Sequence, residues 1–129
     1  MPGITAMKLQ KLVYYCQAWS LVWDERPIFN EKIEAWANGP VVRELFQAHR
    51  GAYNVYKING DVRVLGKAQE ETIDAVIRAY GDKSSEWLAE LTHREAPWKD
   101  ARTGLMPGER GDKEITHDAM AWYYSSLKP

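Results

Sequence analysis

The chain is poor in cysteine and in long apolar runs. Cys16 is its single cysteine, so no disulfide can form within the chain. The apolar stretches end well before the roughly 20 residues that span a bilayer, which predicts no membrane segment. The N-terminus lacks the basic region and apolar run of a secretory signal. We therefore expect a protein of the cytoplasm that does not enter a membrane.

An excess of one charge is also missing. The sequence has 17 basic and 18 acidic residues and a net charge of −1. Proteins that bind the phosphate backbone usually carry a strong basic excess, and here acidic residues interleave with basic ones throughout. Lys8 and Lys11 are interpreted as part of an ordinary solvated helix face. The composition does not favour direct binding to nucleic acid.

The motifs of catalysis and metal binding are absent as well. His49, His93 and His117 are scattered, whereas a zinc site needs clustered Cys and His ligands. There is no nucleophile elbow, Walker loop or dinucleotide fingerprint. Cys16 falls on an apolar helix face, where a buried thiol is commoner than a reactive one. Glu34 has no partner acid, so pairing with a lysine or capping a helix is the favoured interpretation. We expect no catalytic residue, no cofactor and no metal.

What the sequence does have is enough apolar material for one folded domain. Hydrophobic residues make up 45% of the 129 residues, so we expect a single domain over residues 1–129. Apolar periodicity and capping residues predict helices over residues 5–22, 40–50, 70–80, 84–93, 97–102 and 116–127. The inward faces are expected to include Ile77, Trp87, Met120 and Leu127.

Residues 33–46 form the predicted centre of the fold. Alternation over residues 33–37 predicts a short strand with one buried face. Gly39 can adopt backbone angles that other residues avoid. Pro40, which lacks an N–H group, is predicted to open the next helix, with Gly51 as its C-terminal cap. Strand, hinge and helix would then follow one another within about twenty residues.

A second source of strands is the Asn59-Gly60 pair between two alternating apolar stretches. This pair is a strong signal for a hairpin, because both turn positions favour positive φ. Together with residues 33–37 the hairpin would give a small antiparallel sheet. The expected fold class is α+β and predominantly helical, with about five helices and a small antiparallel sheet.

Aromatic side chains are abundant, with six Trp and seven Tyr. Trp23, Trp98 and residues 122–124 are too many to bury in a domain of this size, so some should reach the surface. An exposed aromatic patch is typical of a protein interface. That interface could also be one between two copies of this chain.

Three segments carry a resemblance to a known family: residues 8–19 (KLQKLVYYCQAW), 33–42 (IEAWANGPVV) and 91–102 (LTHREAPWKDAR). In this order and spacing they resemble the Panacea domain, an antitoxin family that includes SocA-like and phage-associated proteins. The resemblance extends from Leu9 to Tyr124 and so covers nearly the whole chain.

The resemblance implies a bacterial or prophage protein without catalytic activity. Members of the family bind and neutralise a cognate protein toxin, usually encoded beside them. In one branch the domain is an adaptor that delivers the toxin to an AAA+ protease, which is the main alternative. Because the domain pairs with varied toxins, the resemblance does not name the partner.

Aromatic and arginine side chains dominate binding hot spots. On residue type and motif position, we expect the partner to bind near Tyr15, Trp36, Arg43 and Trp98. Two further alternatives remain open at this point. One is an enzyme that modifies its target through Glu34 and His93, and the other is a transcriptional autoregulator that binds its own promoter.

Overall fold

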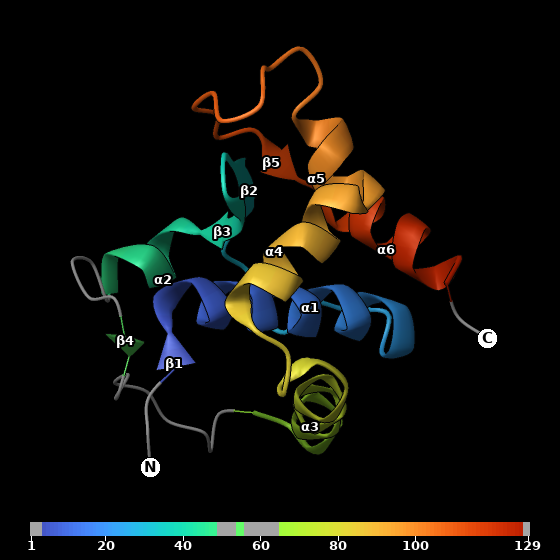
Figure 1. Cartoon of the computed structure of the whole chain (residues 1–129). Helices are drawn as coiled ribbons and strands as arrows, with labels where there is room; N and C mark the ends of the chain where they lie inside the picture. Colours follow the sequence, from blue (N-terminus) through green and yellow to red (C-terminus); the bar gives the residue numbers. More distant parts are fainter. Residues whose placement is uncertain (1–3, 49–53, 56–64, 128–129) are drawn as a thin grey trace.

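The computed structural model describes residues 4–48, 54–55 and 65–127 (Figure 1). Within them six helices and five short strands follow in the order β1 (Ile4–Thr5), α1 (Ala6–Trp23), β2 (Ile33–Trp36), β3 (Gly39–Val42), α2 (Arg43–Ala48), β4 (Asn54–Val55), α3 (Lys67–Tyr80), α4 (Ser85–Arg94), α5 (Ala96–Ala101), β5 (Glu114–Ile115) and α6 (His117–Ser125). The predicted class, α+β and predominantly helical, is confirmed. In the described part of the chain no helix is both long and apolar enough to cross a membrane.

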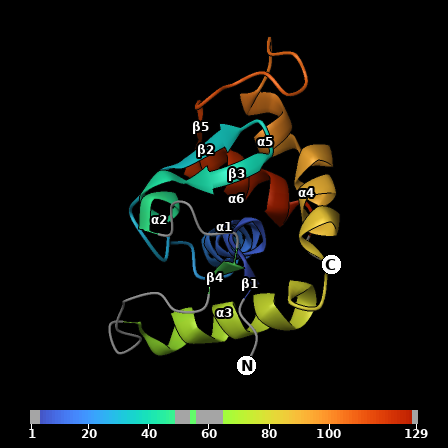
Figure 2. The ribbon, with the colours of Figure 1, turned by 60° about the vertical axis from the view of Figure 1, so that its left-hand side comes forward.

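Helix α1 is the centre of the molecule. It contacts α3, α4, α6 and strand β3, and Figures 1 and 2 show it between α3 and the hairpin of β2 and β3. The Thr5 hydroxyl caps its first turn by accepting a hydrogen bond from the backbone N–H of Lys8, at 3.1 Å. A helix covered on several sides needs apolar residues around much of its circumference, as the sequence predicts.

The core around α1 is built largely of tyrosines. Tyr14, Tyr15 and Tyr124 are each 1% exposed or less. The ring of Tyr15 stacks on that of Tyr80 with 4.3 Å between centroids, and its edge meets the ring of Tyr124. Aromatic pairs of this kind contribute about 0.5–1.5 kcal/mol beyond the area that they bury. These contacts tie α1 to α3 and α6.

Two buried glutamines fasten other segments to α1. The Gln10 amide accepts a hydrogen bond from Val42 N–H at 2.9 Å and donates one to the Val42 carbonyl at 3.3 Å. The Gln17 amide accepts from the N–H groups of Ile28 and Phe29 and donates to the Phe29 carbonyl. Both side chains thus pair with main-chain groups of segments that pack on α1, buried at Val42 and partly buried at Ile28 and Phe29.

The three-stranded sheet corrects one prediction. Its order is β3-β2-β5, with Ala35 opposite Pro40 and Ile33 opposite both Val42 and Ile115. The strand over residues 33–37 is confirmed as β2. The prediction that Pro40 opens a helix is wrong, because Pro40 lies within β3 and the helix begins at Arg43. An edge strand tolerates proline, since one of its sides needs no N–H donor.

Strand β5 was not predicted. In a second, two-stranded sheet, β1 pairs antiparallel with β4, and Ile4 lies opposite Val55. The predicted turn at Asn59-Gly60 and the expected cap at Gly51 lie outside the described residues.

The remaining helices begin and end close to the predicted positions. Ser84 and Thr116 accept hydrogen bonds from the backbone of their own first turns, Gly81 ends α3, and Pro97 lies in the first turn of α5. These confirm the predicted capping residues.

Three side chains predicted to face inward do not. Ile77 is 51% exposed, Leu127 49% and Trp87 41%. On α3 the face turned toward the core instead runs through Thr72, Val76 and Tyr80, spaced four residues apart. The inward face of that helix is therefore narrower than its apolar sequence pattern suggests.

Candidate functional site

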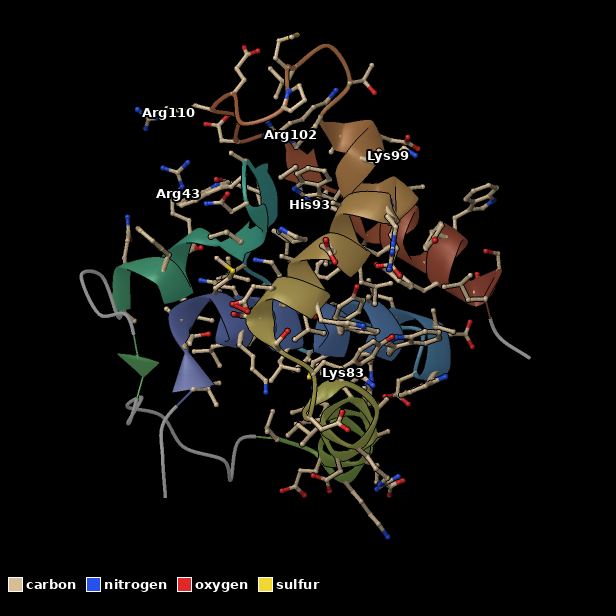
Figure 3. All side chains as sticks on the ribbon, viewed as in Figure 1. Arg43, Lys83, His93, Lys99, Arg102 and Arg110 are labelled. Atoms are coloured by element: carbon tan, nitrogen blue, oxygen red, sulfur yellow. The ribbon has the colours of Figure 1, made fainter. Side chains whose placement is uncertain are left out.

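A cleft of about 660 Å³ opens between the N-terminal half of α1, the β2–β3 hairpin, α2 and the loop before β5. Figure 3 shows Arg43 and Arg110 on the same side of the molecule, above α2 and the hairpin. The described residues that line the cleft are Ala6, Met7, Gln10, Lys11, Trp36, Ala37, Asn38, Val41, Arg43, Phe46, Arg110, Gly111 and Asp112.

The rim of the cleft is held by a carboxylate shared between two donors. Glu34 Oε1 accepts a 2.8 Å hydrogen bond from Trp36 Nε1 and a 2.9 Å bond from Arg43. The guanidinium of Arg43 also lies 3.6 Å from Asp112 and 5.9 Å from the centre of the Trp36 ring. These contacts orient two exposed or half-buried side chains that are typical of binding hot spots.

The same contacts set the charge of Glu34. Burial alone would raise the pKa of its carboxyl, but the hydrogen bonds from Arg43 and Trp36 and the charges of Arg43 and Lys32 outweigh it and lower the pKa. Glu34 therefore remains an anion near neutral pH and is a poor general acid. The expectation of an ion pair is right, although the partner is an arginine and not a lysine.

Phe46 extends the aromatic part of the rim. Its ring meets that of Trp36 edge-on, with 5.1 Å between centroids, and it is 37% exposed. The sequence predicts Phe46 to face inward along its helix. Because α2 has only six residues and its described side chains are not fully buried, it presents Phe46 at the edge of the cleft.

Lys11 corrects the prediction of a solvated face. It lines the cleft, yet it is 1% exposed, and burial lowers the pKa of its ammonium to about 8. Lys11 belongs to the buried stripe of α1 with Tyr14, Tyr15 and Ala18, at spacings of three, four and seven residues. The burial of Lys11 could have been inferred from its position in the sequence, because it has the same helical spacing as the apolar residues of that face.

Trp98 supports the cleft from behind. Its indole N–H donates a 2.9 Å hydrogen bond to the carbonyl of Trp36, and its ring stacks on His93 with 4.1 Å between centroids. The Arg102 guanidinium lies 5.3 Å from the Trp98 ring and donates to the Ala35 carbonyl. Trp98 thus fixes the backbone of β2 where the strand reaches the cleft.

His93 is in an electropositive environment. Burial lowers the pKa of its imidazole, and the charges of Lys11 and Arg102 lower it further, while a backbone hydrogen bond at Asn38 acts in the opposite direction. Among the described side chains its Nε2 is the one fully buried polar atom without a hydrogen-bond partner. A neutral imidazole with an enclosed nitrogen offers little to an external target.

Tyr15 lies in the core and not at the cleft. It is 0% exposed, and its hydroxyl donates a 2.6 Å hydrogen bond to Glu95. Unlike Lys11, it is not among the described residues that line the cleft. Of the four expected partner-binding residues, the structure brings Trp36 and Arg43 together at the rim, places Trp98 behind them and encloses Tyr15.

The described residues give little support to thiol or metal chemistry. Burial raises the pKa of the Cys16 thiol to about 12, which keeps it protonated and poorly nucleophilic. Over residues 4–48, 54–55 and 65–127 no group of three or more His, Cys, Asp or Glu side chains could hold a metal ion. The described part of the cleft offers aromatic surface, cations and hydrogen-bond donors, which are means of recognition.

Comparisons with known proteins agree with the resemblance in the sequence. The model of one family, described as Antitoxin SocA-like, Panacea domain, matches residues 9–99. Neither the curated proteins nor the solved structures provide a match. The matched segment runs from α1 into α5 and includes Lys11, Trp36, Arg43 and Trp98. Because the family covers well over half of it, the chain belongs to the SocA-like antitoxin family with a Panacea domain.

Proposed function

We propose that the protein is an antitoxin that neutralises a protein toxin by binding it directly, with the cleft and its rim as the contact surface. Membership of the antitoxin family supports a protein partner. The observation that carries the choice of surface is the side-by-side presentation of Trp36 and Arg43 by a shared hydrogen-bond acceptor, Glu34. Preorganised aromatic and guanidinium groups lose little conformational entropy on binding.

The contact with the toxin would involve more surface than the cleft alone. A standard interface buries about 800 Å² on each partner, so it must extend beyond the cleft itself. Met7, Phe46 and Arg43 are exposed around the opening and extend it without drawing on the core. Neutralisation would then follow from occlusion of the toxin surface in the cytoplasm.

The proposal is tested by co-expression with the product of the neighbouring reading frame. We expect that product to stop growth when expressed alone and growth to resume when this protein is present. Trp36→Ala and Arg43→Ala should each weaken the rescue. Trp87→Ala is the matched control, because Trp87 is 41% exposed on α4 and does not line the cleft, so rescue should persist. Full rescue by both cleft variants would remove the cleft from the proposal.

The stability of the variants separates binding from folding. The Arg43 side chain is exposed, and solvent weakens its ion pair with Glu34, so Arg43→Ala should unfold close to the wild-type temperature. The cells of the co-expression test also distinguish occlusion of the toxin from its delivery to an AAA+ protease. Occlusion leaves the half-life of the toxin unchanged, whereas an adaptor shortens it only while the protease is present.

A further inference from the structure

Lys11 is a buried cation held tightly beneath the β2–β3 turn. A Cβ atom built on Gly39 would lie 2.4 Å from Lys11 Cε and 2.8 Å from Nζ. The bare backbone of Gly39 therefore makes room for the end of the lysine side chain. The same packing places the ammonium at a fixed point of the cleft wall.

The Lys11 ammonium has no counter-charge in the described part of the chain. No described carboxylate lies within ion-pair distance of it, and no described group accepts a hydrogen bond from it. Burying a charge without a partner is unfavourable by several kcal/mol, so a group of opposite charge brought to the cleft would stabilise Lys11. At neutral pH this group still carries its proton, because burial lowers its pKa only to about 8.

The rest of the cleft is suited to a peptide segment carrying one negative charge. Its volume of about 660 Å³ falls within the range of roughly 300–1,000 Å³ typical of sites for organic ligands, far more than a single ion needs. Arg43 and Arg110 add positive charge, and Met7, Trp36 and Phe46 add apolar surface. The charge of Lys11 also bears on His93, so a bound anion would relieve the field at both residues.

We propose that the cleft binds an acidic residue of the partner protein, whose carboxylate pairs with the Lys11 ammonium while its flanking residues contact Trp36 and Phe46. This inference deepens the proposed function and rests on it. The anion is taken to be a carboxylate because the expected partner is a protein, whose unmodified anionic side chains are Asp and Glu.

The test uses a library of random heptapeptides displayed on phage, which works whether or not the toxin has been identified. The library is selected against the wild-type protein, Lys11→Met and Lys99→Met. Lys99 is the matched control, because it is exposed on α5 and Figure 3 shows it away from Arg43 and Arg110. We expect Asp or Glu next to apolar residues to be enriched by the wild-type and Lys99→Met proteins and not by Lys11→Met.

A synthetic copy of the strongest wild-type peptide then measures the contribution of its carboxylate. Replacing its acidic residue by Gln or Asn should weaken binding to wild type by about tenfold or more, as expected for a charge-assisted hydrogen bond. Against Lys11→Met the two peptides should bind equally. Urea unfolding of Lys11→Met shows that the variant is folded, so a loss of selectivity cannot be ascribed to unfolding.

Several results would overturn the inference. The selection would do so if no peptide were enriched, if the wild-type protein enriched peptides without acidic residues, or if Lys11→Met kept the preference for acidic residues. The peptide competition would do so if inorganic phosphate displaced the bound peptide at a lower concentration than acetate. The last result would indicate a general anion site. Growth rescue is scored separately. Growth rescue without an acidic preference would support the antitoxin function and contradict the proposed acidic-residue site. An acidic preference without growth rescue would support the site and contradict the antitoxin function.

Discussion

The Tyr15 hydroxyl, from the middle of α1, donates a 2.6 Å hydrogen bond to the Glu95 carboxylate between α4 and α5. Tyr124 of α6 donates to the same oxygen at 2.7 Å, and the hydroxyls of Tyr124 and Tyr14 are 2.9 Å apart. One carboxylate therefore joins three helices at the centre of the molecule. Tyr15, which the sequence analysis expected near the partner because of its residue type, is part of this interior network.

Removing the Tyr15 hydroxyl should lower stability and leave partner binding unchanged. Tyr15→Phe leaves a buried carboxylate with one donor fewer, which costs about 1–3 kcal/mol. Tyr123→Phe is the control, because that half-buried hydroxyl donates no hydrogen bond to a described residue. Urea unfolding measures both variants. A Tyr15→Phe protein with wild-type stability but weaker toxin binding would return Tyr15 to the interface.

Glu95 should make stability depend on acidity in a defined direction. Burial raises the pKa of its carboxyl above 4.5, although the hydrogen bonds from Tyr15 and Tyr124 oppose the rise. As the pH increases, Glu95 ionises in the unfolded chain before it does so in the folded protein. The contribution of Glu95 to the free energy of unfolding is therefore fully present below pH 4.5 and is lost as the pH rises through the raised pKa. Glu95→Gln removes this loss. The melting temperature of Glu95→Gln should rise relative to that of wild type as the pH increases above 4.5, and a constant difference would contradict the assignment.

Lys11 should impose the opposite dependence at alkaline pH. Burial lowers the pKa of its ammonium from 10.5 to about 8, which corresponds to on the order of 3 kcal/mol of lost stability while the group is charged. Below pH 8 this penalty is fully present, and it disappears as pH rises toward 10.5. Lys11→Met should therefore be more stable than wild type at pH 7, by a margin that shrinks at pH 10.

The charged and titratable groups around Lys11 must be considered in that comparison. They are His93 from α4, Arg43 from α2, and Arg110 and Asp112 from the loop before β5. All are present in both proteins, so the difference between the two unfolding free energies reports Lys11 together with its effect on the pKa of His93. A wild-type protein as stable as Lys11→Met at pH 7 would show that the ammonium is already compensated in the free state.

The contact between Gly39 and Lys11 can be measured by a double-mutant cycle. Gly39 has a φ of +131°, a conformation unfavourable for a residue with a Cβ atom, and that atom would also collide with the lysine. Gly39→Ala should therefore cost about 1–3 kcal/mol from backbone strain, and more from the collision. In a Lys11→Ala background only the strain remains. A coupling of less than about 0.5 kcal/mol would mean that the two residues do not interact.

Local chemistry predicted much of this fold. The capping residues Ser84 and Thr116 mark helix starts because their hydroxyls bind the next turn directly, an interaction within three residues of sequence. The positive φ of Gly39 could likewise be foreseen from the residue itself. Such features depend on near neighbours and can be derived from sequence alone.

Features that depend on distant partners were missed or misplaced. Pro40 has the local properties of a helix start, and pairing with Ala35 at the sheet edge overrides them. Strand β5 has two residues and exists because Ile115 meets Ile33. Lys11 has the local sequence properties of a surface lysine, but in the structure the β2–β3 turn covers it. The candidate site is formed where these long-range contacts meet, which is why only Trp36 and Arg43 of its rim were anticipated.

The attachment of Val42 to Gln10 has a practical implication for engineering. Gln10 accepts a hydrogen bond from the Val42 N–H and donates one to the Val42 carbonyl, so neither bond involves the side chain at position 42. The hairpin is held to the central helix by its peptide groups. Substitutions around the opening could therefore redirect the domain to a new target while the framework beneath keeps its shape.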